Sequence, residues 1–188
     1  SKIAPDGEDP ERGNLSDVVL RERLREKLKE FNPQVPDSAI QETMGELLGF
    51  SSPKIIRNNR NFHQNLVSGV HVEYEENDEQ KGEFVDIIDF EEPENNDFLI
   101  SNQFQIQIGD NTKRIPDILV FINGLPVGIV ENKNPTDADA TVQSAYRQVT
   151  KTYESDIPDL FQYVEFIVVM DSKNAKVGTL STPWEWYS

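Results

Sequence analysis

Two carboxylates and an amine lie on what the sequence predicts to be one β-hairpin. Asp117 ends the tetrapeptide Arg114-Ile115-Pro116-Asp117, and Glu131-Asn132-Lys133 follows a second apolar run. Mg²⁺ takes oxygen ligands in proteins, often one or two carboxylates completed by water or a substrate phosphate. An ammonium group beside the ion can offset charge that develops on a scissile phosphate. These residue types therefore predict a site for Mg²⁺-dependent phosphodiester cleavage.

The predicted hairpin consists of two apolar, β-branched runs, 117–122 and 125–130, around Asn123-Gly124. Asn-Gly between two such runs is a strong short-range signal for a β-hairpin. Because both runs are apolar at nearly every position, we expect both sheet faces to be covered by helices and the hairpin to be central.

The spacing of the two carboxylates makes a prediction about hairpin register. Across a two-residue Asn123-Gly124 turn, Asp117 would oppose Val130, and Glu131 would point to the other face. The carboxylates converge only if the hairpin has an odd-length loop or a β-bulge. A three-residue loop, 122–124, with its glycine in the left-handed conformation, would place them roughly 7–8 Å apart on a diagonal. We predict one of these irregularities.

A second interpretation needs no metal. Glu131 and Lys133 are two residues apart on a strand, so their side chains point to the same face and can form a structural ion pair. The sheet would then be a non-catalytic docking module with a vestigial nuclease site. In the metal interpretation, the backbone carbonyl of Asn132 can add a third oxygen ligand to those of Asp117 and Glu131.

The segments 114–126 and 130–135 resemble the nuclease module of the restriction (R) subunit of type I restriction-modification enzymes, a member of the PD-(D/E)xK superfamily. The likeness covers nearly all of the chain after about Leu15. It includes Asn59–His63, Gly69–Tyr74, Asn95–Leu99, Ile157–Phe161 and Val177–Leu180. The resemblance implies an α/β, restriction-endonuclease-like fold, with a mixed central β-sheet flanked by helices. It also implies Mg²⁺-dependent cleavage of double-stranded DNA.

The resemblance implies that Asp117, Glu131 and Lys133 are the catalytic residues. It also implies a supporting Gln-xxx-Tyr pair on the next helix, for which the nearest match is Gln148 and Tyr153, one residue too far apart. On an α-helix a five-residue step separates two side chains by roughly 140°, against 40° for four residues. The pair therefore shares a face only if the helix has a π-bulge or another distortion.

The resemblance further implies a longer subunit with an ATP-driven motor, which works with modification and specificity subunits. This chain has no G-x-x-x-x-G-K-[ST] loop, so we expect ATP to bind only the full-length subunit. We assign 1–14 to a flexible lead-in, 15–182 to the nuclease domain and 183–188 to the start of a linker to the motor. Trp184, Trp186 and Tyr187 are then expected to be poorly buried.

Composition limits the alternatives. The chain has 188 residues, 36% of them hydrophobic, no cysteine and a net charge of −16. It can form one domain with a core, and it has neither a membrane-length apolar run nor a visible signal peptide, which favours the cytoplasm. The segment from His71 to Asp97 contains twelve Asp and Glu residues but only one Lys. We therefore expect only weak binding of double-stranded DNA by this fragment, because duplex affinity comes largely from Lys and Arg.

Hydrophobic periodicity and turn residues predict the remaining elements. Helices are expected over 17–30, capped by Ser16, and over 37–47, 53–67 and 136–154. Strands are expected over 70–74, 83–90, 98–108 and 163–170, with loops at 78–82 and 91–96. Basic residues of the first helix, Arg21, Arg23, Arg25, Lys27 and Lys29, form either a solvated face or a phosphate-binding track. His63 is expected to be a structural hydrogen-bonding residue.

Overall fold

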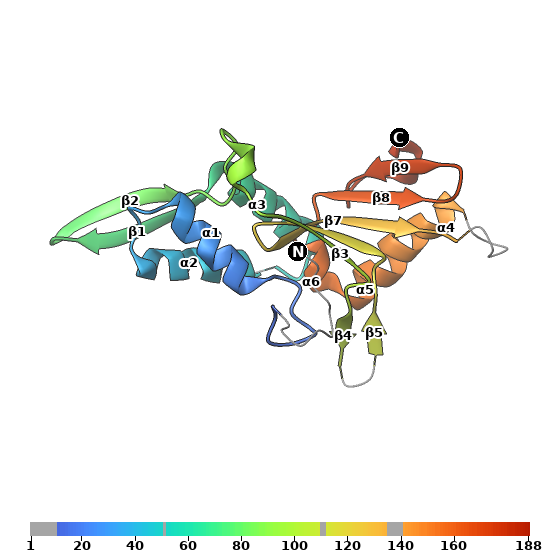
Figure 1. Ribbon diagram of the computed structural model, residues 1–188, viewed down its shortest axis with the longest axis horizontal. Helices are drawn as coiled ribbons and strands as arrows, with labels where there is room; N and C mark the ends of the chain where they lie inside the picture. Colours follow the sequence, from blue (N-terminus) through green and yellow to red (C-terminus); the bar gives the residue numbers. More distant parts are fainter. Residues whose placement is uncertain (1–10, 51, 110–111, 135–140) are drawn as a thin grey trace.

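The computed structural model describes residues 11–50, 52–109, 112–134 and 141–188. The molecule is elongated (Figure 1). A β-hairpin projects at one end, and a five-stranded sheet with three short helices forms the other. In the part of the chain described, no helix is long and apolar enough to cross a membrane.

Three helices open the fold: α1 (Arg21–Phe31), α2 (Asp37–Leu48) and α3 (Ile55–Ser68). The predicted start of α1 at Asp17, with Ser16 as its cap, is wrong. The backbone N–H of Leu20 instead donates to the carbonyl of Gly124 at 2.9 Å, so this segment runs along the sheet hairpin before the helix begins. The prediction for α2 is confirmed to within one residue at its end, and α3 begins two residues after Pro53.

A separate two-stranded sheet consists of β1 (Val70–Glu76) and β2 (Glu79–Val85). The predicted loop at 78–82 is therefore wrong beyond Asp78, and the strand predicted over 83–90 is confirmed only for residues 83–85. The turn is formed by Asn77 and Asp78, whose φ angles are 55° and 63°. Asn and Asp tolerate this left-handed conformation, which a tight two-residue hairpin turn requires.

The central sheet is mixed and has the strand order β3-β6-β7-β8-β9. Only the β7–β8 pair is parallel. The strands are β3 (Phe98–Asn102), β6 (Ile118–Ile122), β7 (Leu125–Asn132), β8 (Phe166–Met170) and β9 (Ala175–Gly178). The hairpin β6–β7 is central, as predicted.

The strand predicted over 98–108 is interrupted after β3. Gln103 has a φ of 53°, and the chain then forms a small hairpin of β4 (Ile106–Ile108) and β5 (Thr112–Arg114). After β7 come α4 (Val142–Arg147), the π-helical segment η2 (Gln148–Tyr153), α5 (Glu154–Asp156) and α6 (Pro158–Phe161). Part of the predicted helix 136–154 lies outside the described residues. Single 3₁₀ turns occur at η1 (Pro93–Asn95) and η3 (Trp184–Trp186).

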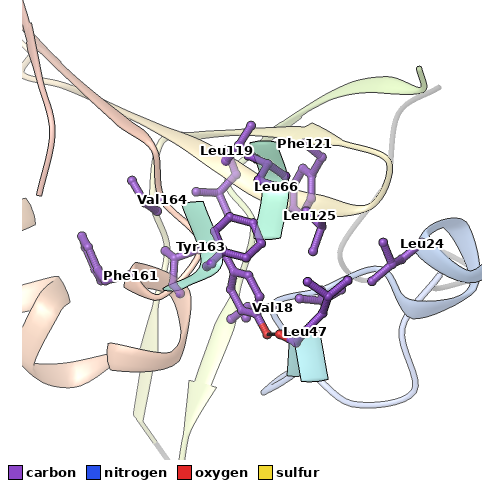
Figure 2. Close-up of a cluster of buried hydrophobic side chains, with 14 of the residues drawn as sticks. Val18, Leu24, Leu47, Leu66, Leu119, Phe121, Leu125, Phe161, Tyr163 and Val164 are labelled. Carbon is purple, nitrogen blue, oxygen red and sulfur yellow. Dashed lines mark hydrogen bonds between the residues drawn. The ribbon is translucent and has the colours of Figure 1, made fainter. Parts of the chain in front are cut away.

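The core lies on one face of the central sheet, where helices cover it. Figure 2 shows Leu119 and Phe121 of β6 beside Leu66 of α3 and Tyr163. The hydroxyl group of Tyr163 donates to the carbonyl of Leu47 at 3.2 Å, which links the start of the β8 segment to α2. The other face of the sheet carries half-buried and exposed side chains. Helix cover on both faces, as predicted, is therefore observed on only one.

Both ends of the described chain differ from the prediction. Within the predicted lead-in, residues 1–10 lie outside the described residues, but Arg12 is buried and donates to the carbonyls of Leu15 and Asp17. At the other end Trp186 is 77% exposed, as predicted, whereas Tyr187 is only 2% exposed. Its ring packs against Tyr146 of α4, so the prediction of poor burial is wrong for this residue.

Candidate active site

The β6–β7 hairpin turn has two residues, not three. Asn123 and Gly124 have φ angles of 52° and 84°. A side chain at position 124 would place its Cβ 2.5 Å from the carbonyl oxygen of Leu20, so glycine is required both by the backbone and by the close approach of the preceding segment. With such a turn alone, the two carboxylates would lie on opposite faces.

A β-bulge in β7 changes the register. Phe121 pairs with Pro126, but Val120 pairs with Gly128, so Val127 is an extra residue. Proline lacks an N–H group and is compatible with a central strand chiefly at such irregularities. The prediction of a loop or bulge is confirmed, and the irregularity is the bulge.

The bulge brings the two carboxylates to the same face. Ile118 pairs with Val130, so Asp117 and Glu131 are directly opposite rather than diagonally offset. The backbone N–H of Asn132 donates to Asp117 Oδ2 at 2.8 Å. Asp117 is half-buried and Glu131 is 3% exposed, so the second carboxylate lies at the inner end of the site.

Gln148 connects the other predicted site residues. Its Nε2 donates to Glu131 Oε1 and to the hydroxyl oxygen of Tyr153, both at 2.6 Å. Its Oε1 accepts a short hydrogen bond from Lys133 Nζ, which also lies 3.6 Å from Glu131 Oε1. All five predicted catalytic and supporting side chains therefore gather around this end of the hairpin.

A π-helical segment aligns Gln148 with Tyr153. Segment η2 spans these two residues, and its wider turn places side chains five residues apart on one face. Thr150 Oγ1 donates to the carbonyl of Tyr146 at 2.8 Å inside this stretch. The condition under which Gln148 and Tyr153 can share a face, a π-type distortion of the helix, is therefore met. Tyr153 also donates to the carbonyl of Ile115 at 3.4 Å, a backbone contact that sequence reasoning missed.

The electrostatics of the site are dominated by Glu131. Burial first, and the nearby negative charge of Asp117 second, raise the pKa of Glu131 to about 7, although Lys133 opposes the shift. Burial and then the charge of Glu131 raise the pKa of Tyr153 to about 12. Near neutral pH the site therefore disfavours two simultaneous negative charges, which is the condition that a bound cation relieves.

One buried oxygen of the site has no hydrogen-bond partner. Glu131 Oε2 is buried and has no hydrogen-bond partner among the residues described. Buried carboxylate oxygens normally have partners, because leaving one unsatisfied is costly. In the same part of the chain no group of three or more His, Cys, Asp or Glu could hold a metal. Asp117 and Glu131 provide two carboxylates, a number that suits an ion such as Mg²⁺ when water or a substrate phosphate completes its coordination shell.

An ion pair beside the site was not predicted. Arg114 Nε donates to Asp156 Oδ2 at 2.7 Å and links the end of β5 to α5. The positive charge of Arg114 lowers the pKa of Tyr153, opposing the effect of burial. Arg114 belongs to the tetrapeptide that ends in Asp117, which was the available sequence signal, but its partner lies too far along the chain to be inferred.

The basic side chains of α1 are largely neutralised within the chain. Arg23 forms ion pairs with both Glu11 and Asp97. Lys29 Nζ lies 2.7 Å from Asp37 Oδ1. Arg21 and Lys27 also have carboxylate partners, Asp17 and Glu30. These contacts favour the interpretation without a phosphate-binding track.

His63 takes the structural role that the sequence suggests. Its Nδ1 lies 2.7 Å from Glu165 Oε2, so it links α3 to the segment before β8. That segment lies at the opposite end of β8 from the Asp117–Glu131 site, since β8 runs parallel to β7.

The sequence comparisons agree with this geometry. Residues 1–186 match the family described as the type I restriction enzyme R protein N terminus. The chain belongs to this family. It is 39% identical over 180 residues to the type I restriction enzyme HindI endonuclease subunit of Haemophilus influenzae. It is 33% identical over 177 residues to the putative type I restriction enzyme MjaIXP endonuclease subunit of Methanocaldococcus jannaschii.

The family members compared are much longer than this chain. Each of the two alignments covers 93% of the chain but 17% of the relative. This R protein N-terminal region therefore corresponds to a small part of an endonuclease subunit in those relatives.

Proposed function

We propose that this chain is the nuclease module of a type I restriction enzyme R subunit and that it hydrolyses phosphodiester bonds of double-stranded DNA with Mg²⁺. The observation that carries the proposal is the bulge-dependent convergence of Asp117 and Glu131, with one oxygen of Glu131 left unsatisfied. Family membership supports the same assignment. An antiparallel β6–β7 pair followed by a parallel β8 supports a restriction-endonuclease-like fold of the PD-(D/E)xK type.

Each side chain has a role in this proposal. Asp117, Glu131 and the Asn132 carbonyl would hold the ion, which would supply Lewis-acid polarisation of the phosphodiester and lower the pKa of a bound water. Lys133 stabilises negative charge that develops on the phosphate. Gln148 accepts from Lys133 and donates to Glu131, so it sets the distance between the ammonium and the inner carboxylate. Tyr153 holds the amide of Gln148 in that orientation.

The proposal includes partners that this chain alone does not provide. A net charge of −16 and the internal pairing of the α1 cations predict weak binding of DNA by the fragment. We infer that stable contact requires the rest of the R subunit, which binds ATP, together with modification and specificity subunits. This assembly would operate in the cytoplasm.

A second candidate function is a non-catalytic docking module with a vestigial site. The observation in its favour is that Lys133, Gln148 and Glu131 already form a connected network without any ion. Under this alternative, an added metal leaves the network unchanged and the carboxylates have no role in cleavage.

Two measurements test the proposed function. Crystals soaked in Mn²⁺ should show anomalous density between Asp117 and Glu131, and an undisturbed ion pair would favour the docking alternative. In the complete restriction complex, Asp117→Ala, Glu131→Ala and Lys133→Ala should each reduce DNA cleavage at least about 100-fold, because each removes charge stabilisation in the transition state.

The same variants should leave ATP-driven translocation unchanged. Lys151→Ala is a matched control for Lys133→Ala, since Lys151 is exposed on η2 and lies outside the network. Cleavage at the wild-type rate in any of the three site variants would remove that residue from the mechanism.

A further inference from the structure

The central sheet has one face that no described helix covers. Outside the bulged start of β7 (residues 125–127), pairing places alternate side chains of all five strands on this side, which we call the outer face. Its members are Phe98, Ile100, Asn102, Ile118, Val120, Ile122, Gly128, Val130, Asn132, Phe166, Val168, Met170, Ala175 and Val177. All of them except Gly128 are half-buried or exposed.

The outer face is apolar although it is accessible. Phe98 and Ile100 of the edge strand are 59% and 64% exposed, and Val177 at the other edge is 45% exposed. A sheet face that meets water normally carries polar residues in alternation with the core face. Here the polar members are two asparagines, each at the last residue of its strand. The composition is that of a face made to be covered.

Contiguous apolar patches of this kind mark interaction sites. Isolated exposed apolar residues are ordinary, but monomers rarely expose patches larger than a few hundred Å² unless they are functional. The outer face extends over every strand of the sheet, from β3 at one edge to β9 at the other. Its occupant must therefore be an extended apolar surface, such as the packed helices of another domain.

We propose that the outer face docks the part of the R protein that lies beyond this N-terminal region. The matched relatives carry most of their length outside the aligned segment, which is 17% of each. The family match runs to residue 186, and Ser188 pairs with Val177 of the outer face, so a segment that follows this region in an R protein would start beside the docking surface. A tethered partner has a high effective concentration and covers the face without a second molecule.

The docking surface lies directly beside the proposed nuclease site. Ile118 follows Asp117, Val130 precedes Glu131, and these two apolar residues are paired on the outer face. A domain seated there contacts the strand positions next to both carboxylates. The inference rests on family membership and on the apolar face, and it holds or fails independently of whether the carboxylates bind a metal.

Cysteine labelling tests the docking surface, since the chain contains no cysteine. Ile100→Cys and Val177→Cys report on the two edges of the outer face. Glu79→Cys is the control, on the projecting β1–β2 hairpin (Figure 1). Maleimide labelling of each position is followed by peptide mass spectrometry in this chain alone and in the full-length R protein.

We expect labelling at positions 100 and 177 to be at least about tenfold slower in the full-length R protein, and labelling at 79 to change less than about twofold. Equal rates at position 100 in both proteins would overturn the proposal. Protection in this chain alone that grows with protein concentration, together with a dimer mass in sedimentation, would also overturn it, because the occupant would then be a second copy.

Discussion

Replacing Glu131 with glutamine should abolish a loss of stability that the metal-free protein undergoes as pH rises. The pKa of Glu131 rises from 4.5 to about 7 on folding, because burial and Asp117 disfavour its charge. Between these two values the folded chain holds a proton that the unfolded chain has released, so stability falls as pH rises. Stability associated with the neutral carboxyl is fully present below pH 4.5 and is lost as pH rises through about 7.

The size of the effect follows from the shift. One pKa unit corresponds to about 1.4 kcal/mol, so the wild type should lose about 3 kcal/mol relative to Glu131→Gln between pH 4.5 and 8. Glutamine keeps the shape of the side chain and can still accept from Gln148 through its own oxygen. For a chain of this size the difference corresponds to roughly 6–12 °C in melting temperature.

The assay is denaturant unfolding of both proteins in EDTA, at half-unit steps from pH 4.5 to 8.5. Any constant offset from altered packing cancels, because the prediction concerns the change of the difference with pH. Glu42→Gln, on the exposed side of α2, is measured in parallel as a control for the substitution itself. A flat difference for Glu131→Gln would refute the reasoning, since Glu131 would then titrate alike in the folded and unfolded states.

Three further outcomes follow from the structure. At pH 8, saturating Mg²⁺ should stabilise the wild type by about 2.7 kcal/mol at 100 times its Kd and leave Glu131→Gln nearly unchanged, as measured by thermal unfolding. Deleting the exposed Thr152 should give a four-residue step between Gln148 and Tyr153, so η2 should become α-helical. The complete enzyme should then retain DNA cleavage. Loss of cleavage in a normally folded deletion variant would contradict the aligning role of the π turn. Gly124→Ala should destabilise the chain by about 1–3 kcal/mol or more in urea unfolding, because the φ of residue 124 is positive and the new Cβ would meet the carbonyl of Leu20. Gly45→Ala in α2 is the control: its Cβ would meet nothing within 4 Å, and the substitution should stabilise the chain by about 1 kcal/mol.

The site was largely predictable from sequence because its parts are local. The Asn123-Gly124 turn and the two apolar runs define the hairpin, and counting residues shows that it must be irregular. The position of the bulge was not predicted, although Pro126 carried a signal, since a proline inside a central strand suggests a bulge. The resemblance paired Gln148 with Tyr153, and their five-residue spacing showed that they could share a face only on a distorted helix, but it did not show that the distortion exists.

Long-range packing explains most of what was missed. Tyr187 is buried because its ring packs against Tyr146 and occupies the space beside Gly178, which has no side chain. No local sequence pattern indicates either contact. Helix α1 begins later than predicted because the backbone N–H of Leu20 donates to the carbonyl of Gly124, a residue more than half the chain away. The hydropathy pattern could not predict that helices cover only one face of the sheet, because the uncovered face is as apolar as the covered one.

The bulge at Val127 and the π turn at η2 each insert one residue between two members of the site. Adding or removing one residue in β6 or β7 therefore turns every later side chain of that strand to the opposite face of the sheet. Among homologues, we expect insertions between the two carboxylates to occur in pairs, or to coincide with loss of the bulge. Sequences that break this rule should also have lost one of the two acids, which gives a way to separate active from decayed modules by counting residues.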